Sequence, residues 1–357
     1  MVQRAGRYTD LMATLRDVAS MAGVSISMAS RVLGDVPHVR VRADTRERIH
    51  AAARELDYRP NFAGRALKSA RSNVIAMIVP DIANAVFTEL MSGVEEGALE
   101  RDYVVLLGRS EDMQPGGEMI RRLIGEGRVD GMLLQLDDEA TREGVDLLLQ
   151  QRAPLVFINS IEADHVGSVT LHDEEGARVA TDHLMGLGHV RIALATGIPN
   201  TWTSARRERG FRDAITRAGL SVRESYIVRH GYTPGNGRTA LRALMELPEP
   251  PTAIFIANVN AAVGALAEAR LMGIRVPEEL SLIAMHDSWV GEHTWPPLTT
   301  VKMPLRELGQ RAVQSLHERM HGADPTDVVV GNPAPKVILR ESTATPPGKA
   351  SGDNVLR

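Results

Sequence analysis

The sequence predicts a small all-α helix-turn-helix head followed by an α/β body of two parallel-sheet lobes. Apolar residues recur at helical spacing within residues 14–56, whereas from residue 73 onward short apolar runs alternate with amphipathic stretches. The charge is divided in the same way. Residues 1–72 hold 13 basic and 7 acidic side chains, which leaves 28 of the 41 basic and 38 of the 45 acidic side chains to the remainder. A basic head on an acidic body predicts a polyanionic partner for the head alone.

The composition excludes several classes of protein. A length of 357 residues allows more than one domain, and the absence of cysteine excludes disulfide scaffolds, cysteine zinc sites and thiol catalysis. No run approaches the roughly 18 apolar residues of a membrane helix. The N-terminus lacks the basic segment and apolar core of a signal peptide. We therefore expect a cytoplasmic protein.

Three helices are expected in the head, after a flexible tail of residues 1–13. Thr14 can cap the first helix and Gly23 ends it, Ser25 can cap the second, and the third begins near Thr45. The apolar residues expected to pack between these helices are Leu15, Val18, Ala19, Ala22, Met28, Ala29, Val32, Leu33, Ile49, Ala52, Ala53 and Leu56.

Two short helices joined by a tight glycine turn and closed by a third form a helix-turn-helix. Such a unit can also bind a protein. The second helix, however, turns small or polar side chains outward, namely Ile26, Ser27, Ser30 and Arg31. Together with the basic charge, this face favours DNA as the partner.

The head closely resembles that of lac/gal-type repressors. The segments that carry the resemblance are residues 14–25 (TLRDVASMAGVS), 29–33 (ASRVL), 45–48 (TRER) and 58–61 (YRPN), and near the other end 340–343 (REST). The resemblance therefore covers about residues 14–343, and it implies a DNA-binding domain over residues 14–60.

The resemblance implies that the second helix lies in the major groove of DNA. Arg31 would pair with guanine, Ile26 would offer apolar contact to a thymine methyl, and polar side chains would contact phosphates. Met28 stands where the family usually has threonine, which removes one expected phosphate contact. The full implied DNA-binding set is Thr14, Ser25, Ile26, Ser27, Ser30, Arg31, Thr45, Asn61 and Leu67.

Residues 61–72 are interpreted as a hinge helix and linker. The segment 61–68 (NFAGRALK) is similar to the hinge helix of the family, which folds on the operator and inserts a leucine, here Leu67, into the minor groove. Such a segment is too short to be stable alone. Gly64 replaces the usual alanine and is expected to cost about 0.5–1 kcal/mol of helix stability. A plain linker is the alternative.

The body reads as repeated strand–helix units. Its apolar runs lie at residues 74–79, 104–107, 132–134, 155–158, 192–195, 253–257 and 280–285. This alternation predicts parallel sheets that bind ligands at the carboxyl ends of their strands, between the lobes. The resemblance implies a periplasmic-binding-protein-like effector and dimerisation domain over residues 73–344. Crossings near 170, 300 and 328 would give lobe 1 (73–170 and 300–327) and lobe 2 (171–299 and 328–344), followed by a flexible tail of residues 345–357.

Effector-binding positions carry over from the resemblance. The implied set is Asn84, Phe87, Asn159, Arg207, Tyr232, Asn258, His286 and Asp287. Arg207 can fork onto a hydroxyl pair or a carboxylate. Val86, Val259 and His286 depart from the pattern of sugar-binding members, because an aromatic residue or carboxylates are usual there. A sugar or sugar derivative is the default effector, and an acid or aromatic effector is the alternative.

The sequence gives little support for a dinucleotide site, a metal site or a catalytic site. A dinucleotide fingerprint is matched by residues 235–240 (GNGRTA), but no preceding strand or following acidic strand end completes it. No metal-ligand spacing and no catalytic motif is present, so no cofactor or metal is expected. Trp202, Trp289 and Trp295 lie beside strand ends, where they could stack on a flat ligand or simply pack. The sequence thus favours a homodimeric repressor on a palindromic operator over an α/β sugar-binding protein or enzyme whose head binds a protein.

Overall fold

The computed structural model describes residues 13–34, 40–59, 71–111, 117–136, 142–150, 153–160, 166–199 and 201–348. The chain divides into two compact units, residues 1–72 and 73–357, which are considered separately. The predicted hinge residues Asn61 and Leu67 lie outside the described residues.

The head consists of three helices, α1 (Leu15–Met21), α2 (Ile26–Leu33) and α3 (Ala43–Glu55). A reciprocal capping box between Thr14 and Asp17 starts α1, and the hydroxyl of Ser25 caps α2 by accepting from the Met28 amide at 3.1 Å. The third helix begins at Ala43, two residues before the predicted start. All twelve predicted core residues belong to the cluster that joins the helices.

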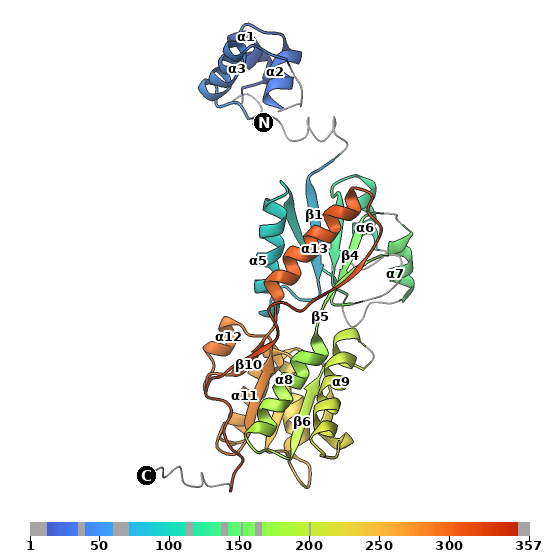
Figure 1. The fold of residues 1–357 in the computed structure, drawn as a ribbon, viewed down its shortest axis with the longest axis vertical. Coiled ribbons are helices and arrows are strands. Elements are labelled where there is room, and N and C mark those ends of the chain that lie inside the picture. Colours follow the sequence, from blue (N-terminus) through green and yellow to red (C-terminus); the bar gives the residue numbers. More distant parts are fainter. Residues whose placement is uncertain are drawn as a thin grey trace, which may run out of the picture. The chain divides into compact units, whose positions relative to one another are not determined.

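Two six-stranded sheets form the body (Figure 1). The first, in lobe 1, has the order β11-β5-β4-β3-β1-β2, and the second, in lobe 2, has the order β12-β10-β9-β8-β6-β7. Lobe 1 contains β1 (Val74–Val79), β2 (Val104–Arg109), β3 (Gly131–Leu134), β4 (Leu155–Ile158), β5 (Ser168–Leu171), β11 (Asp327–Val330), α5 (Val86–Leu99), α6 (Glu118–Gly125), α7 (Arg142–Leu149) and α13 (Leu305–Met320). Lobe 2 contains β6 (Ile192–Thr196), β7 (Ile227–Arg229), β8 (Ala253–Ile256), β9 (Ser281–Met285), β10 (Thr299–Lys302), β12 (Lys336–Ile338), α8 (Asp173–Gly186), α9 (Trp202–Arg217), α10 (Pro234–Met245), α11 (Val259–Leu271), α12 (Trp289–Glu292) and a 3-10 turn at Glu224–Tyr226.

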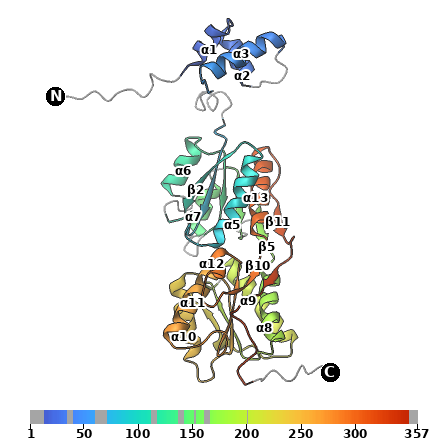
Figure 2. The ribbon, with the colours of Figure 1, turned by 90° about the vertical axis from the view of Figure 1, so that its left-hand side faces the viewer.

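Strand pairing is parallel except between β10 and β12. Helices cover both faces of each sheet, as Figure 2 shows for α8 on one side of lobe 2 and α10 and α11 on the other. In β1, Ile75 and Met77 belong to one buried cluster whereas Ala76 and Ile78 belong to another. A strand buried on both faces must be apolar at every position, which explains the continuous apolar runs of the sequence.

The chain passes between the lobes three times, after β5, after β10 and after β11. The predicted crossings near 300 and 328 were placed too early. Thr299–Lys302 belongs to the sheet of lobe 2, and Asp327–Val330 pairs with β5 in lobe 1. The first and third crossings lie in contact at His172 and Gly331. A Cβ atom added to Gly331 would lie only 2.3 Å from His172 Cδ2.

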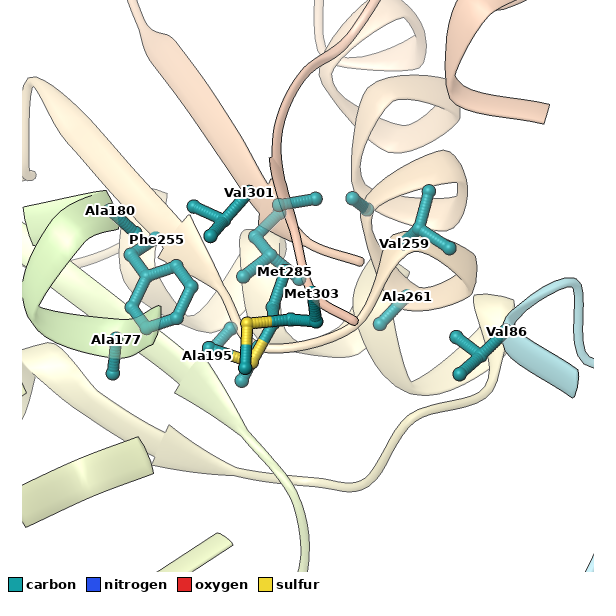
Figure 3. Close-up of a cluster of buried hydrophobic side chains, with 14 of the residues drawn as sticks. Val86, Ala177, Ala180, Ala195, Phe255, Val259, Ala261, Met285, Val301 and Met303 are labelled. Carbon is teal, nitrogen blue, oxygen red and sulfur yellow. The ribbon is translucent and has the colours of Figure 1, made fainter. Parts of the chain in front are cut away.

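The lobes also meet directly at one wall. The Ala85 amide donates to Asn260 Oδ1 at 3.4 Å, and the Lys302 ammonium lies 3.3 Å from the Glu89 carboxylate. Figure 3 shows Val86 of lobe 1 beside Ala261 of lobe 2, within one buried cluster that continues through both lobes. Replacing the usual aromatic residue by Val86 therefore leaves an apolar contact between the lobes.

Two histidines, the buried His189 and the partly buried His183, bond the segment after β12 to lobe 2. The His189 ring contacts Thr252 Oγ1 at 2.9 Å, and its Nε2 lies 2.9 Å from the Ala344 carbonyl oxygen. His183 Nε2 lies 3.1 Å from Thr343 Oγ1. Burial lowers the pKa of both histidines below the ordinary value of 6.5. Both rings are therefore neutral in the folded protein near neutral pH.

This arrangement predicts a loss of stability in mild acid. Unfolded histidines bind protons below pH 6.5, whereas His183 and His189 in the folded state resist protonation, so the free energy of unfolding falls as the pH drops through that value. Thermal denaturation between about pH 7.5 and about pH 5.5 measures the effect. The midpoint of His183→Gln should fall less steeply than that of the wild type, and parallel curves would contradict the prediction.

Candidate functional site

An exposed face of α2 carries the side chains predicted to contact bases. Ile26 is 45% exposed, and Ser27 and Arg31 are exposed one helical turn apart. Arg31 Nη2 donates to Ser27 Oγ at 2.9 Å, which holds the guanidinium along the outer surface of the helix. Five N–H donors on this surface suit the paired acceptors of a guanine edge.

The other predicted DNA contacts surround this face. Thr14 and Ser25 cap α1 and α2, so their hydroxyls lie at helix N-termini, where phosphate oxygens are favoured. Ser30 and Thr45 are partly exposed. Met28 packs against the core of the head, which accounts for an apolar residue at a position where the family usually has threonine.

A cavity of about 750 Å³ lies between the two lobes of the body. Seven of the eight predicted effector residues line it, namely Asn84, Phe87, Asn159, Arg207, Tyr232, Asn258 and His286. Asn159 and His286 each follow the end of a strand with a positive φ, 53° and 71°. Such a backbone conformation is uncommon for residues other than glycine and is typical of functional sites.

Asp287 does not line the cavity, contrary to the prediction. Its Oδ1 accepts from Thr300 Oγ1 at 2.7 Å and lies 2.9 Å from Arg340 Nη2. The Asp287 carboxylate is thus held by the motif at residues 340–343. Trp289 and Trp295 are 64% and 84% exposed and also lie outside the lining, whereas Trp202 is part of it.

Arg207 is the most constrained residue of the cavity. It is 3% exposed, its Nε donates to Asp173 Oδ1 at 2.7 Å, and its Nη1 donates to the Ala257 carbonyl oxygen at 2.6 Å. The guanidinium carbon lies 5.4 Å from the centre of the Tyr232 ring. Although burial alone would lower the pKa of Arg207, the Asp173 carboxylate raises it, so the guanidinium stays charged.

His286 completes this network as a neutral ring. Burial, together with the charge of Arg207, lowers the pKa of His286 well below 6.5. Arg207 Nη2 lies 2.9 Å from His286 Nε2, and a guanidinium can only donate, so Nε2 accepts. The ring proton therefore sits on Nδ1, which has no hydrogen-bond partner among the described residues.

Further buried polar atoms of the lining also lack partners within the described part of the chain. They include Gln135 Oε1, Asn159 Oδ1, Ser160 Oγ and Trp202 Nε1. Buried polar groups are normally hydrogen-bonded, so this group of donors and acceptors indicates a polar ligand. The sequence did not predict Gln135, Ser160, Asn236 or Asn260. Single amides and hydroxyls are ordinary both in turns after strands, where Gln135 and Ser160 lie, and in the first turns of helices, where Asn236 and Asn260 lie.

Asp173 was also missed. It opens α8, where an acidic residue favours the helix N-terminus and so carries no distinctive signal in the sequence. Within the described ranges no cluster of three potential metal ligands occurs, and no helix is long and apolar enough to cross a membrane.

Comparison with known proteins identifies the family of both parts of the chain. Residues 14–61 match the model "Bacterial regulatory proteins, lacI family", and residues 181–343 match "Periplasmic binding protein-like domain". The transcriptional repressor CytR of Escherichia coli K12 is 33% identical over 314 residues, covering 87% of this chain and 90% of CytR.

The chain belongs to the lacI family. It is a DNA-binding transcriptional repressor regulated by a small-molecule effector, and not an enzyme. A solved lacI-family regulator from Mycobacterium smegmatis is 40% identical, with a TM-score of 0.72, over 76% of this chain and 99% of the other. The lac repressor dimer bound to operator and the anti-inducer ONPF is 25% identical, with a TM-score of 0.76, over 93% and 99% of the two chains.

The position of Trp202 predicts an optical signal for ligand binding. A ligand that enters the cavity displaces water from the Trp202 indole, so the tryptophan emission should change on titration. Trp202→Phe should abolish the change. The exposed residues Trp289 and Trp295 provide matched controls, and a signal lost in Trp295→Phe but kept in Trp202→Phe would contradict the placement.

Proposed function

We propose that this lacI-family member is a cytoplasmic homodimer whose two heads bind the two halves of a palindromic operator. A sugar or sugar derivative, bound between the lobes, changes its affinity for that operator. The observation that carries this proposal is the cavity itself, where buried amides, hydroxyls and Arg207 surround a space of a size usual for small-molecule sites.

At the operator, we assign base contacts to Ile26, Ser27 and Arg31. The hydrogen bond from Arg31 to Ser27 supports this assignment. It restricts the Arg31 side chain before DNA binds, so less conformational entropy is lost on binding. Phosphate contacts are assigned to Thr14, Ser25, Ser30, Thr45 and Asn61, and the minor-groove wedge to Leu67.

At the cavity, we assign ligand contacts to Asn84, Phe87, Asn159, Arg207, Tyr232, Asn258 and His286. These residues come from both lobes, so a ligand that contacts both walls has a higher affinity for one relative position of the lobes than for another. Only this difference in affinity can shift the population of the lobe arrangements. The shift reaches the operator because the heads of a homodimer must keep the spacing of the two half-sites.

Replacing Arg31 tests the role of α2. Arg31→Ala removes a bidentate contact and should reduce discrimination between operator and random DNA by about 1–3 kcal/mol, roughly 5- to 150-fold. Fluorescence anisotropy with both duplexes measures this. The control is Arg54→Ala, because Arg54 is exposed on α3 and pairs with Glu47 at 2.8 Å. Equal losses in the two variants would refute a specific role for Arg31.

The effector proposal requires a separate measurement. A panel of sugars is screened for a rise in the thermal midpoint, and each hit is added to the operator complex. A hit should change operator affinity in the wild type, and Arg207→Ala should abolish both responses. A hit that stabilises the protein without any change in operator affinity would argue against the regulatory role.

A further inference from the structure

We infer that the cavity selects an uncharged, amphipathic ligand, and that Asp173 is the residue that excludes anions. This inference rests on the proposed function of the cavity as the effector site. It concerns a residue outside the lining, which acts through Arg207, and it decides between the sugar and acid effectors that the sequence left open.

The first observation is the charge balance behind the cavity. Asp173 is fully buried, and the distance from its Oδ1 to Arg207 Nε is 2.7 Å. An unpaired buried cation would attract an anionic ligand strongly, but an ion pair at this distance has almost no net charge when seen from the cavity. Asp173 therefore removes the charge that would otherwise attract a carboxylate.

The second observation is that each nitrogen of the guanidinium is already bonded. Nε donates to Asp173, Nη1 donates to the Ala257 carbonyl oxygen, and Nη2 donates to His286 Nε2. A carboxylate binds arginine best through two parallel hydrogen bonds along one edge. Binding along the edge that includes Nε would break the bond to Asp173, and binding along the Nη1–Nη2 edge would need both of the remaining N–H groups, whereas a single hydroxyl needs only one of them.

The third observation concerns the other charges of the lining. Within the described part of the chain, the acidic and basic residues that line the cavity, apart from Arg207 and the neutral His286, are Asp81 and Asp146, and both are exposed. Both are acidic, so neither attracts an anion. They also offer little to a cation, because water surrounds them and the Asp81 carboxylate already accepts from the Ala83 amide at 2.9 Å.

The fourth observation is an asymmetry between the walls. The aliphatic side chains of the lining lie on lobe 1, and they include Val86, Leu90, Leu136, Val145 and Leu149. Lobe 2 contributes amides, hydroxyls, two aromatic rings and the Arg207 network, and lobe 1 adds polar side chains of its own beside the aliphatic ones, namely Asn84, Gln135, Asn159 and Ser160. A ligand that fits both walls therefore has hydroxyl groups towards lobe 2 and the polar part of lobe 1, and an apolar group towards the aliphatic side chains of lobe 1, as in an uncharged glycoside with an apolar substituent.

The experiment uses matched compounds on the full-length protein. Free pentoses and hexoses, their methyl and phenyl glycosides, and the uronic acids with the same ring stereochemistry are compared by thermal shift and titration calorimetry. We expect uncharged glycosides to bind, phenyl glycosides to bind more tightly than the free sugars, and each uronate to bind at least about tenfold more weakly than its uncharged partner.

Asp173→Asn is the decisive variant. It keeps a hydrogen-bond acceptor for Arg207 but exposes the positive charge, so it should gain at least about tenfold in affinity for the matching uronate. Glu174→Gln makes the same charge change in the same turn of α8, at an exposed site, and should leave the preference unaltered. A wild type that binds uronates as tightly as uncharged glycosides, or a folded Asp173→Asn with no gain, overturns the inference.

Two further arms cover the remaining outcomes. If Asp173→Asn does not fold, the double variant Asp173→Asn with Arg207→Gln removes both charges, and it should retain the preference for uncharged compounds. A panel in which no uncharged compound binds also overturns the inference. Operator binding is measured on the same samples. Ligands that bind without any change in operator affinity would contradict the proposed function. Uronates that bind as tightly as the uncharged compounds would contradict the selectivity alone.

Discussion

The buried ion pair between Arg207 and Asp173 is the constraint on which the effector site depends. Both side chains are almost completely buried, so the loss of either one leaves the other as an unpaired buried charge and costs several kcal/mol of stability. The ion pair forms because α8 and α9 approach closely. At Gly210 of α9 there is no room for a side chain larger than a hydrogen atom. A Cβ atom there would lie 2.2 Å from the Glu174 carbonyl oxygen. Helix packing thus fixes the orientation of the cavity's main cation.

The head depends on a different kind of stabilisation. Its buried core is small and rich in alanine, with Ala19, Ala22, Ala29, Ala52 and Ala53 between the helices. Such side chains allow close helix packing but bury little apolar area each. The caps at Thr14 and Ser25, each worth about 0.5–2 kcal/mol, are therefore a large share of the stability of α1 and α2. The same residues are the ones to which we assign phosphate contacts.

The sequence predicts much of this architecture because periodicity reports burial directly. Helical spacing located α1 and α2, and continuous apolar runs located strands that are buried on both faces. The lobe crossings were placed a few residues early, since short strands such as β10 and β11 give no sharp boundary in the sequence. Side-chain bonds between residues far apart in the sequence were not predicted. Asp287 resembled a strand-end ligand but bonds to Thr300 and Arg340, whereas Asp173 looked like an ordinary helix N-terminal residue.

Asp173 also lies next to a segment that joins the lobes. Asp173 begins α8 directly after His172, which lies in the first crossing and packs against Gly331 of the third. A ligand that bonds to Arg207 therefore contacts the partner of Asp173, and Asp173 is one residue away from the first crossing between the lobes. Uncharged ligands leave this ion pair intact, whereas an anion would compete with Asp173 for the guanidinium. Selection against anions thus preserves the ion pair between Arg207 and Asp173, which connects the cavity to the first crossing.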